Sequence, residues 1–162
     1  MTLPGHSATH FSSVTAYLSF DHRRLDAILA DVRRMVDDGE VERADHAFGD
    51  FFEGLVRHIR IEEEIVFPLF EERVGPSGPV AVMRSEHVVI REALGRMREA
   101  LGRGSAAAFQ VGLVQLLGVL PDHDVKEERI LYPAIDRALS HAERAALVGD
   151  LERAPNGVRS AG

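Results

Sequence analysis

The sequence lacks cysteine altogether, and it contains no long apolar run. Without cysteine the chain can form no disulfide, and no thiolate is available as a nucleophile, as a zinc ligand or as a support for an iron–sulfur cluster. Any metal must therefore be bound through nitrogen and oxygen. No apolar stretch approaches the roughly 18 residues of a membrane-spanning helix, so we expect a soluble protein with no membrane partner.

Positive charge is also in short supply. The chain has 19 lysine and arginine residues against 26 aspartate and glutamate residues, which gives a net charge of −7. Nucleic-acid binding depends on clustered basic residues that neutralise phosphates, so this balance argues against DNA or RNA as a partner. Residues 1–13, which we expect to be flexible, lack the basic and apolar regions of a secretory signal, and we expect a cytoplasmic protein.

Three clusters of turn-forming residues divide the chain, which at 162 residues is long enough for one domain. Between these clusters lie long segments in which apolar residues recur at alternating steps of three and four. This spacing is typical of helices that pack side by side. We therefore predict helices near residues 14–37, 43–73, 80–101 and 106–138.

Short turns between consecutive long helices make neighbouring helices antiparallel. The predicted fold is therefore all-α, an antiparallel up-and-down four-helix bundle over residues 14–138. Ser140 and Glu143 form a capping-box pattern, which predicts a short fifth helix within residues 139–153. Residues 154–162 are expected to form a frayed tail.

Polar residues interrupt the apolar stripe of each of the four long helices. These interruptions are His22, His58, Glu62, His87, His123 and Glu127. Burying such groups in an apolar interface costs on the order of several kcal/mol unless they are paired, so they need a common explanation. Beyond the glutamates, the stripes are predicted to continue through Ile65 and Leu69 in one helix and through Ile130 and Ala134 in another.

The sequence also contains an internal repeat with an offset of 65 residues. Residues His22, His58 and Glu62 of the first copy correspond to His87, His123 and Glu127 of the second. The bundle is therefore two copies of a helical hairpin. We expect a pseudo-two-fold axis that passes through the polar residues.

A histidine and a glutamate four residues apart lie on one helical face, one turn from each other. The second and fourth helices therefore each present an imidazole and a carboxylate to the interior, and the other two helices add one imidazole each. This donor set suits iron, manganese, zinc or copper, and a carboxylate can bridge two ions. Four imidazoles and two carboxylates fit two ions better than one, and they leave room for a bridging oxygen species and an open position.

Simpler interpretations exist for each element taken alone. One histidine in an apolar stripe is more often a hydrogen-bonded core residue than a ligand, and one His-x-x-x-Glu pair can be a surface ion pair. A plain bundle whose histidines are satisfied by its glutamates would bind no metal tightly. The symmetric recurrence of the pattern favours the metal site.

The remaining polar residues receive more modest interpretations. Glu63, Glu64 and Glu128 are expected on the solvated helix faces, with a supporting role for Glu63 or Glu128 as the alternative. Pro68 and Pro133 are expected to kink or loosen their helices past the glutamates. The other side chains considered are Tyr17 and Tyr132, expected to be packing residues, and His6, His10, His46 and His141, expected to be exposed.

The six interrupting residues resemble the ligands of the hemerythrin-like, or HHE, cation-binding family. Their order on four consecutive helices is the order of that family, and the match covers residues 14–138. Ferritin-like bundles are less similar because they use Glu-x-x-His and more carboxylates. Oxygen-carrying hemerythrins have a second histidine where this chain has Arg91, and an aspartate five residues after the histidine where Glu127 follows His123 by four.

The resemblance implies two non-heme iron ions, oxo- or hydroxo-bridged, with Glu62 and Glu127 as bridging carboxylates. It also implies a small-molecule partner, dioxygen, nitric oxide or peroxide, and a role as sensor, scavenger or carrier. The departures leave the metal pair less saturated, which favours redox turnover over stable oxygen carriage. Two alternatives stay open: an iron-binding regulatory or storage module without turnover, and a di-iron oxidase of an organic substrate.

Overall fold

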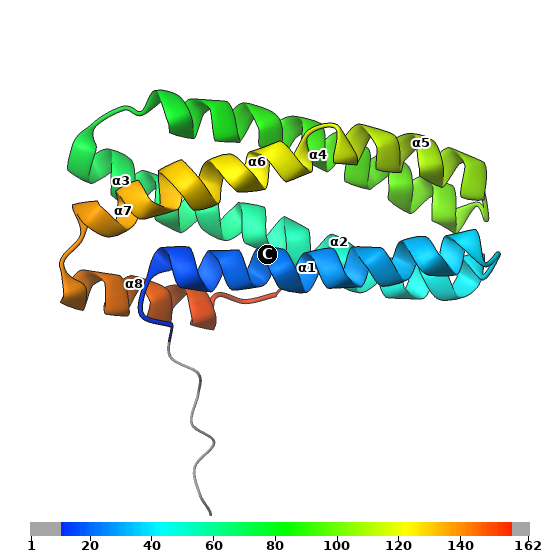
Figure 1. Cartoon of the computed structure of the whole chain (residues 1–162), viewed down its shortest axis with the longest axis horizontal. Helices are drawn as coiled ribbons and strands as arrows, with labels where there is room; N and C mark the ends of the chain where they lie inside the picture. The colour runs from blue at the N-terminus through cyan, green and yellow to red at the C-terminus, as the bar shows by residue number, and fades with distance from the viewer. Residues whose placement is uncertain (1–10, 157–162) are drawn as a thin grey trace, which may run out of the picture.

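A computed structural model describes residues 11–156, and this part of the chain is helical, with no strand. Figure 1 shows its helices in chain order. The elements are α1 Val14–Asp37, α2 Val41–Ile61, η1 Glu62–Val66, α3 Phe67–Val74, α4 Gly78–Gly102, α5 Ala106–Leu117, α6 Leu120–Lys126, η2 Glu127–Leu131, α7 Tyr132–Ala138 and α8 His141–Arg153, where η marks a π-helical turn.

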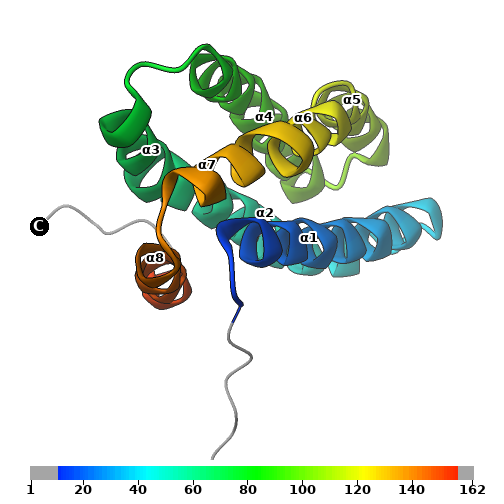
Figure 2. The same cartoon turned by 60° about the vertical axis from the view of Figure 1, so that its left-hand side comes forward.

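The elements form four long rods that run alternately in opposite directions, and the shorter α8 runs alongside the first part of α1 (Figures 1 and 2). The first rod is α1 and the third is α4, while α2, η1 and α3 form the second and α5 to α7 form the fourth. Helix α1 packs on α2, and α4 packs on α5. The all-α, antiparallel up-and-down bundle with a short fifth helix is therefore confirmed.

Serine residues define where several helices begin. The side-chain oxygen of each accepts a hydrogen bond from a backbone amide three residues later, at Ser13, Ser77, Ser105 and Ser140. Such caps satisfy one of the amides that a helix start leaves unpaired. At α8 the Glu143 carboxylate also accepts from the Ser140 amide, which completes the capping box predicted from the sequence.

The second and fourth rods each contain one π turn, and each turn starts at one of the two glutamates. The amide of Phe67 donates to the carbonyl of Glu62, and the amide of Tyr132 donates to the carbonyl of Glu127. Each turn is followed, after one intervening residue, by a proline, which lacks the amide that a regular α-helical ladder needs. The expected loosening is present, but it begins at the glutamates rather than one or two turns beyond them.

A π turn inserts one extra residue, so it rotates the side chains that follow. The predicted continuation of the stripes was therefore wrong after the glutamates. Ile65 and Leu69 are only half-buried, and Ile130 is 58% exposed. The core instead contains Val66, Phe67 and Phe70 from one rod, and Leu131, Tyr132 and Ile135 from the other.

The fourth rod is also interrupted, which the sequence analysis did not anticipate. The predicted helix 106–138 breaks at Gly118 and Val119, between α5 and α6. Pro121 explains the break because its ring clashes with the carbonyl four residues earlier, at Leu117, and it has no amide to donate there.

Two apolar clusters fill the interior. One lies toward the α1–α2 and α4–α5 turns and includes Leu25, Phe48 and Leu94. The other lies toward α8 and includes Leu18 and Phe67. The six predicted site residues lie between these clusters along their helices. None of the helices in residues 11–156 is long and apolar enough to cross a membrane.

The less central predictions have mixed outcomes. His46 and His141 are exposed as expected. The predictions for His6 and His10, for most of the N-terminal segment 1–13 and for the end of the tail lie outside the described residues.

Candidate metal centre

The structure brings all six predicted site residues together at the middle of the bundle. Each is buried, with an exposed fraction of 4% or less, and both glutamates are fully buried. Their ligand atoms form two groups, each within a 4.8 Å span, that could each hold a metal ion. The groups are His22, His58, Glu62 and Glu127, and Glu62, His87, His123 and Glu127.

The two glutamates belong to both groups, so they lie where bridging ligands would be needed. Oε1 of Glu62 lies 3.2 Å from Nε2 of His58, and its Oε2 lies 3.2 Å from Nε2 of His87. Oε1 of Glu127 lies 3.3 Å from Nε2 of His22 and 3.1 Å from Nε2 of His123. Each carboxylate thus faces one imidazole of each half.

Several atoms at this point are buried without a hydrogen bond among the described residues. They are Glu62 Oε2, both carboxylate oxygens of Glu127, Nε2 of His87 and Nδ1 of His123. A buried polar atom without a partner costs free energy, and such atoms are rare in folded proteins. Nδ1 of His123 faces outward, but the three carboxylate oxygens and Nε2 of His87 face the centre of the site, where their lone pairs fit a bound cation.

Each of the four imidazoles also has a carboxylate beside its other ring nitrogen. Asp21 lies 2.8 Å from Nδ1 of His58, Glu128 lies 2.9 Å from Nδ1 of His22, and Glu63 lies 2.9 Å from Nδ1 of His87. The carboxylate of Glu86 lies 3.5 Å from Nδ1 of His123. A carboxylate in this position fixes the orientation of a ligating imidazole and raises its basicity.

These outer carboxylates obey the 65-residue offset. Asp21 corresponds to Glu86, and Glu63 corresponds to Glu128. Of the two roles considered for Glu63 and Glu128 from sequence, the supporting one matches the geometry. Asp21 and Glu86 were missed, although each directly precedes a predicted ligand in the sequence.

Basic residues hold two of the outer carboxylates in place. Nη2 of Arg91 lies 2.8 Å from Glu63 Oε2, and Lys126 is paired with Glu86. Arg91 occupies the position where oxygen-carrying hemerythrins were noted to have another histidine. In this chain the residue at that position, Arg91, holds the carboxylate of Glu63 in place instead.

The imidazoles and carboxylates of the cluster also pair with each other as opposite charges. Burial opposes the protonation of His58, but the charge of Glu62 and the hydrogen bond to Asp21 outweigh it and hold the pKa of the imidazole well above its usual value. Burial likewise opposes ionisation of Glu62, yet the neighbouring His58 and His87 hold the pKa of that carboxyl well below its usual range. Opposite charges therefore stabilise each other in the interior.

Asp124 adds a further carboxylate on the His22 side of the site. Its Oδ1 lies 3.4 Å from Nε2 of His22. Burial raises the pKa of Asp124 to about 7, and the charge of Glu127 adds to this against the opposing effect of His22. No sequence pattern indicates this residue, because the corresponding position of the first repeat is the apolar Ile59.

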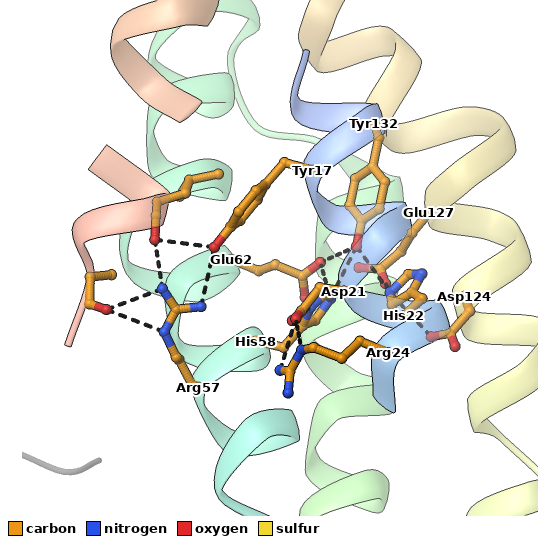
Figure 3. Close-up of polar contacts among 12 residues, drawn as sticks. Tyr17, Asp21, His22, Arg24, Arg57, His58, Glu62, Asp124, Glu127 and Tyr132 are labelled. Atoms are coloured by element: carbon orange, nitrogen blue, oxygen red, sulfur yellow. Dashed lines mark hydrogen bonds and ion pairs between the residues drawn. The ribbon is translucent and has the colours of Figure 1, made fainter. Parts of the chain in front are cut away.

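Tyr132 was expected to be a packing residue, and it does more than pack. The π turn brings its fully buried ring onto the site, where its hydroxyl donates to Oε1 of Glu62. Figure 3 shows the hydroxyl directed at the point where Glu62, His22 and His58 meet. At the corresponding place in the first repeat, Phe67 stacks against the His87 ring, with 5.9 Å between ring centroids and 9° between planes.

A cavity of about 380 Å³ lies between α1 and α6, and one of the six predicted site residues, His22, is among the residues that line it. His22, Asp124 and Glu128 form its polar inner wall, and Leu29 and Leu120 contribute apolar surface. The cavity therefore leaves space for a small molecule beside His22.

Comparison with known proteins agrees with this geometry. The family described as the hemerythrin HHE cation binding domain matches residues 13–135, most of the chain. The chain belongs to the hemerythrin HHE cation-binding family. Proteins of this family bind metal cations, and this chain has the buried histidine and glutamate groups that could hold them.

A relative in Schizosaccharomyces pombe has the description of an uncharacterized hemerythrin-like protein. It is 27% identical over 135 residues, which cover 82% of this chain and 64% of the yeast protein. The chain thus spans somewhat less than two thirds of that relative. No solved structure matches the chain.

Proposed function

We propose that this hemerythrin HHE domain binds two iron ions between Glu62 and Glu127. One ion would be held by His22 and His58, and the other by His87 and His123, with both carboxylates shared. The observation that carries the proposal is the pair of four-residue groups that have these two glutamates in common.

The iron pair would supply reversible binding or reduction of a small molecule, and we propose dioxygen, nitric oxide or peroxide. The cavity beside His22 supports a small ligand because it leaves space next to one imidazole of the site. The protein's own contribution is to orient the imidazoles through Asp21, Glu128, Glu63 and Glu86, and to exclude bulk water with the apolar clusters on either side.

The stoichiometry can be tested half by half. Purified protein is equilibrated with ferrous iron without oxygen, and bound iron is measured for the wild type, for H22A/H58A and for H87A/H123A. We expect two ions per chain in the wild type and one in each double variant, because each removes the imidazoles of one ion only. His46→Ala is the matched control, since His46 is exposed and outside the site, and it should keep two ions.

A wild type that binds no iron, or only one ion, would overturn the proposed di-iron centre. If two ions are bound, admitting oxygen, nitric oxide or peroxide and then removing it separates the roles. A spectral change that reverses supports carriage or sensing, whereas irreversible oxidation supports turnover.

A further inference from the structure

The two halves of the site are related by the 65-residue repeat, but they differ in one buried polar group. The first half has Phe67 after its glutamate, and the second half has Tyr132 at the corresponding position. Both rings are fully buried, and both reach the site through the π turn that precedes them. The repeat therefore places one phenolic oxygen in a centre that is otherwise symmetric in its ligands.

The position of that oxygen is defined by three neighbours. It lies 3.3 Å from Nε2 of His22 and 3.3 Å from Nε2 of His58, and it also contacts Oε1 of Glu62 (Figure 3). These three residues belong to one of the two metal-binding groups. The phenol thus points at one ion position and not midway between the two.

The spacing matches that of ligands on a common ion. With metal–ligand bonds of about 2.1 Å, neighbouring ligand atoms stand about 3.0–3.4 Å apart at octahedral or tetrahedral angles. The distances from the phenolic oxygen to both imidazole nitrogens fall in this range. Tyrosine oxygen is an established kind of ligand for iron.

We propose that Tyr132 binds, through its phenolic oxygen, the ion held by His22 and His58. The proposal rests on the di-iron centre proposed above and makes its two ions inequivalent. Binding breaks the O–H bond of the phenol, forms an oxygen–metal bond and releases the proton to solvent, with no change in oxidation state. The ion at His22 and His58 then has five protein ligands, and the ion at His87 and His123 has four, so the second ion has the larger share of open positions.

The chain makes the experiment simple because it contains two tyrosines, Tyr132 and Tyr17. The hydroxyl of Tyr17 contacts the carbonyl of Leu151 and Nη1 of Arg57, away from the six ligands. Ferric iron bound to a tyrosinate gives a visible charge-transfer absorption, and resonance Raman excitation in that band reveals phenolate ring vibrations. Absorption, Raman spectra and bound iron are measured on the ferric wild type, Tyr132→Phe and Tyr17→Phe.

We expect the wild type and Y17F to show the tyrosinate band, and Y132F to lose it while it still binds two irons. If Y132F fails to fold, retention of the band in Y17F still assigns it, since one tyrosine remains. A wild type with two irons and no tyrosinate band, or a Y132F variant that keeps the band, would overturn this proposal but leave the di-iron function standing. A wild type without iron would instead overturn the function on which the proposal rests.

A gain-of-function variant tests the same point from the other half. Phe67→Tyr places a phenol at the corresponding position near His87. We expect F67Y to strengthen the band, and F67Y combined with Y132F to restore a band that Y132F alone lacks. If the combined variant folds, binds two irons and has no band, the two positions are not equivalent as ligand positions, and the assignment of the band rests on Y132F and Y17F.

Discussion

Oδ2 of Asp21 lies 2.8 Å from Nδ1 of His58, whereas the corresponding pair in the second repeat, Glu86 and His123, is 3.5 Å apart. Asp21 is buried and is also bonded to Arg24. Glu86 is shared with Lys126. The carboxylate beside His58 is therefore closer to its imidazole than the carboxylate beside the equivalent His123.

This difference predicts unequal effects of removing the two charges. Asp21→Asn keeps the shape but loses the negative charge that makes His58 more basic, so we expect metal affinity to fall by about 10–100-fold. Glu86→Gln should have a smaller effect, because its contact with His123 is longer. Competition against a coloured chelator with cobalt(II) or zinc(II) measures both. An effect of E86Q as large as that of D21N would contradict this account.

The metal-free protein should be less stable at pH 8 than at pH 6. Carboxylates hold the pKa of His22, His58 and His123 above the usual 6.5, against the effect of burial. A raised histidine pKa stabilises the fold fully below pH 6.5, and this contribution is lost as the pH rises through the folded value. The lowered pKa of Glu62 affects stability only at acidic pH. Its contribution to the free energy of unfolding is lost as the pH falls below about 4.5.

Bound metal should reverse the trend, because ligating imidazoles are neutral and metal binding releases their protons. Thermal unfolding at pH 6 and pH 8, with a chelator and with excess zinc(II), measures both states. We expect the thermal unfolding midpoint of the chelated protein to be lower at pH 8 than at pH 6. The increase in the midpoint on adding zinc(II) should be larger at pH 8 than at pH 6. If the chelated protein is instead more stable at pH 8 than at pH 6, then protonated imidazoles paired with carboxylates do not stabilise the cluster.

The bundle and the six site residues could be predicted because both depend on helical periodicity. A polar residue in an apolar stripe is visible in the sequence, and a histidine and a glutamate four residues apart stay on one face as long as the helix is regular. The 65-residue repeat then supplied the second copy. Glu62 and Glu127 lie at the start of the π turns, so the predictions up to these residues were unaffected by the change of register.

Tyr132 could not be recognised in this way. Its place on the site face depends on the extra residue of the η2 turn, and periodicity with a step of 3.6 directs it elsewhere. Pro133 was the available signal, because it deprives the preceding turn of a regular hydrogen bond. Asp124 was missed for another reason: its burial follows from the packing of α1 against the fourth rod, which no pattern within its own helix encodes.

Asp124→Asn should stabilise the metal-free protein, and by an amount that grows with pH. The folded-state pKa of this carboxyl is about 7, against 3.8 for the ordinary value, so folding favours its protonated form. The penalty for the ionised form therefore develops as the pH rises from about 4 to about 7 and is constant above that. At about 1.36 kcal/mol per pKa unit, the gain from the uncharged amide at pH 8 is at most about 4 kcal/mol.

Asp122→Asn is the matched control, because Asp122 lies on the same helix and is exposed. Urea unfolding of both variants and the wild type, in the presence of a chelator at pH 5 and pH 8, gives the difference in unfolding free energy. We expect D124N to gain more at pH 8 than at pH 5, and D122N to change little at either. Equal gains for D124N at both pH values would show that the Asp124 carboxyl is not perturbed by burial.

Arg57 attaches α8 to the bundle, and its removal should loosen that helix without emptying the site. Nη2 of Arg57 donates to the carbonyls of Leu151 and Ala154 at 2.6 and 3.1 Å, and Nε donates to Ala154 at 3.2 Å. These carbonyls lie at the end of α8, where backbone partners become scarce, although the carbonyl of Leu151 also accepts from the amide of Ala154 at 3.3 Å. Figure 3 shows the guanidinium between the second rod and this helix end.

Arg57→Met keeps much of the side-chain volume and removes every donor, so we expect a loss of roughly 2–3 kcal/mol in the free energy of unfolding. Amide hydrogen exchange within α8 should accelerate more than exchange in α1 or α4, because the docking of α8 is what the variant weakens. Arg33→Ala, at an exposed position on α1, serves as the control. Uniformly faster exchange would mean that Arg57 supports the whole bundle. Unchanged exchange in α8 would mean that other contacts hold that helix, such as the packing of Leu147 and Val148 and the pairing of Arg73 with Glu143.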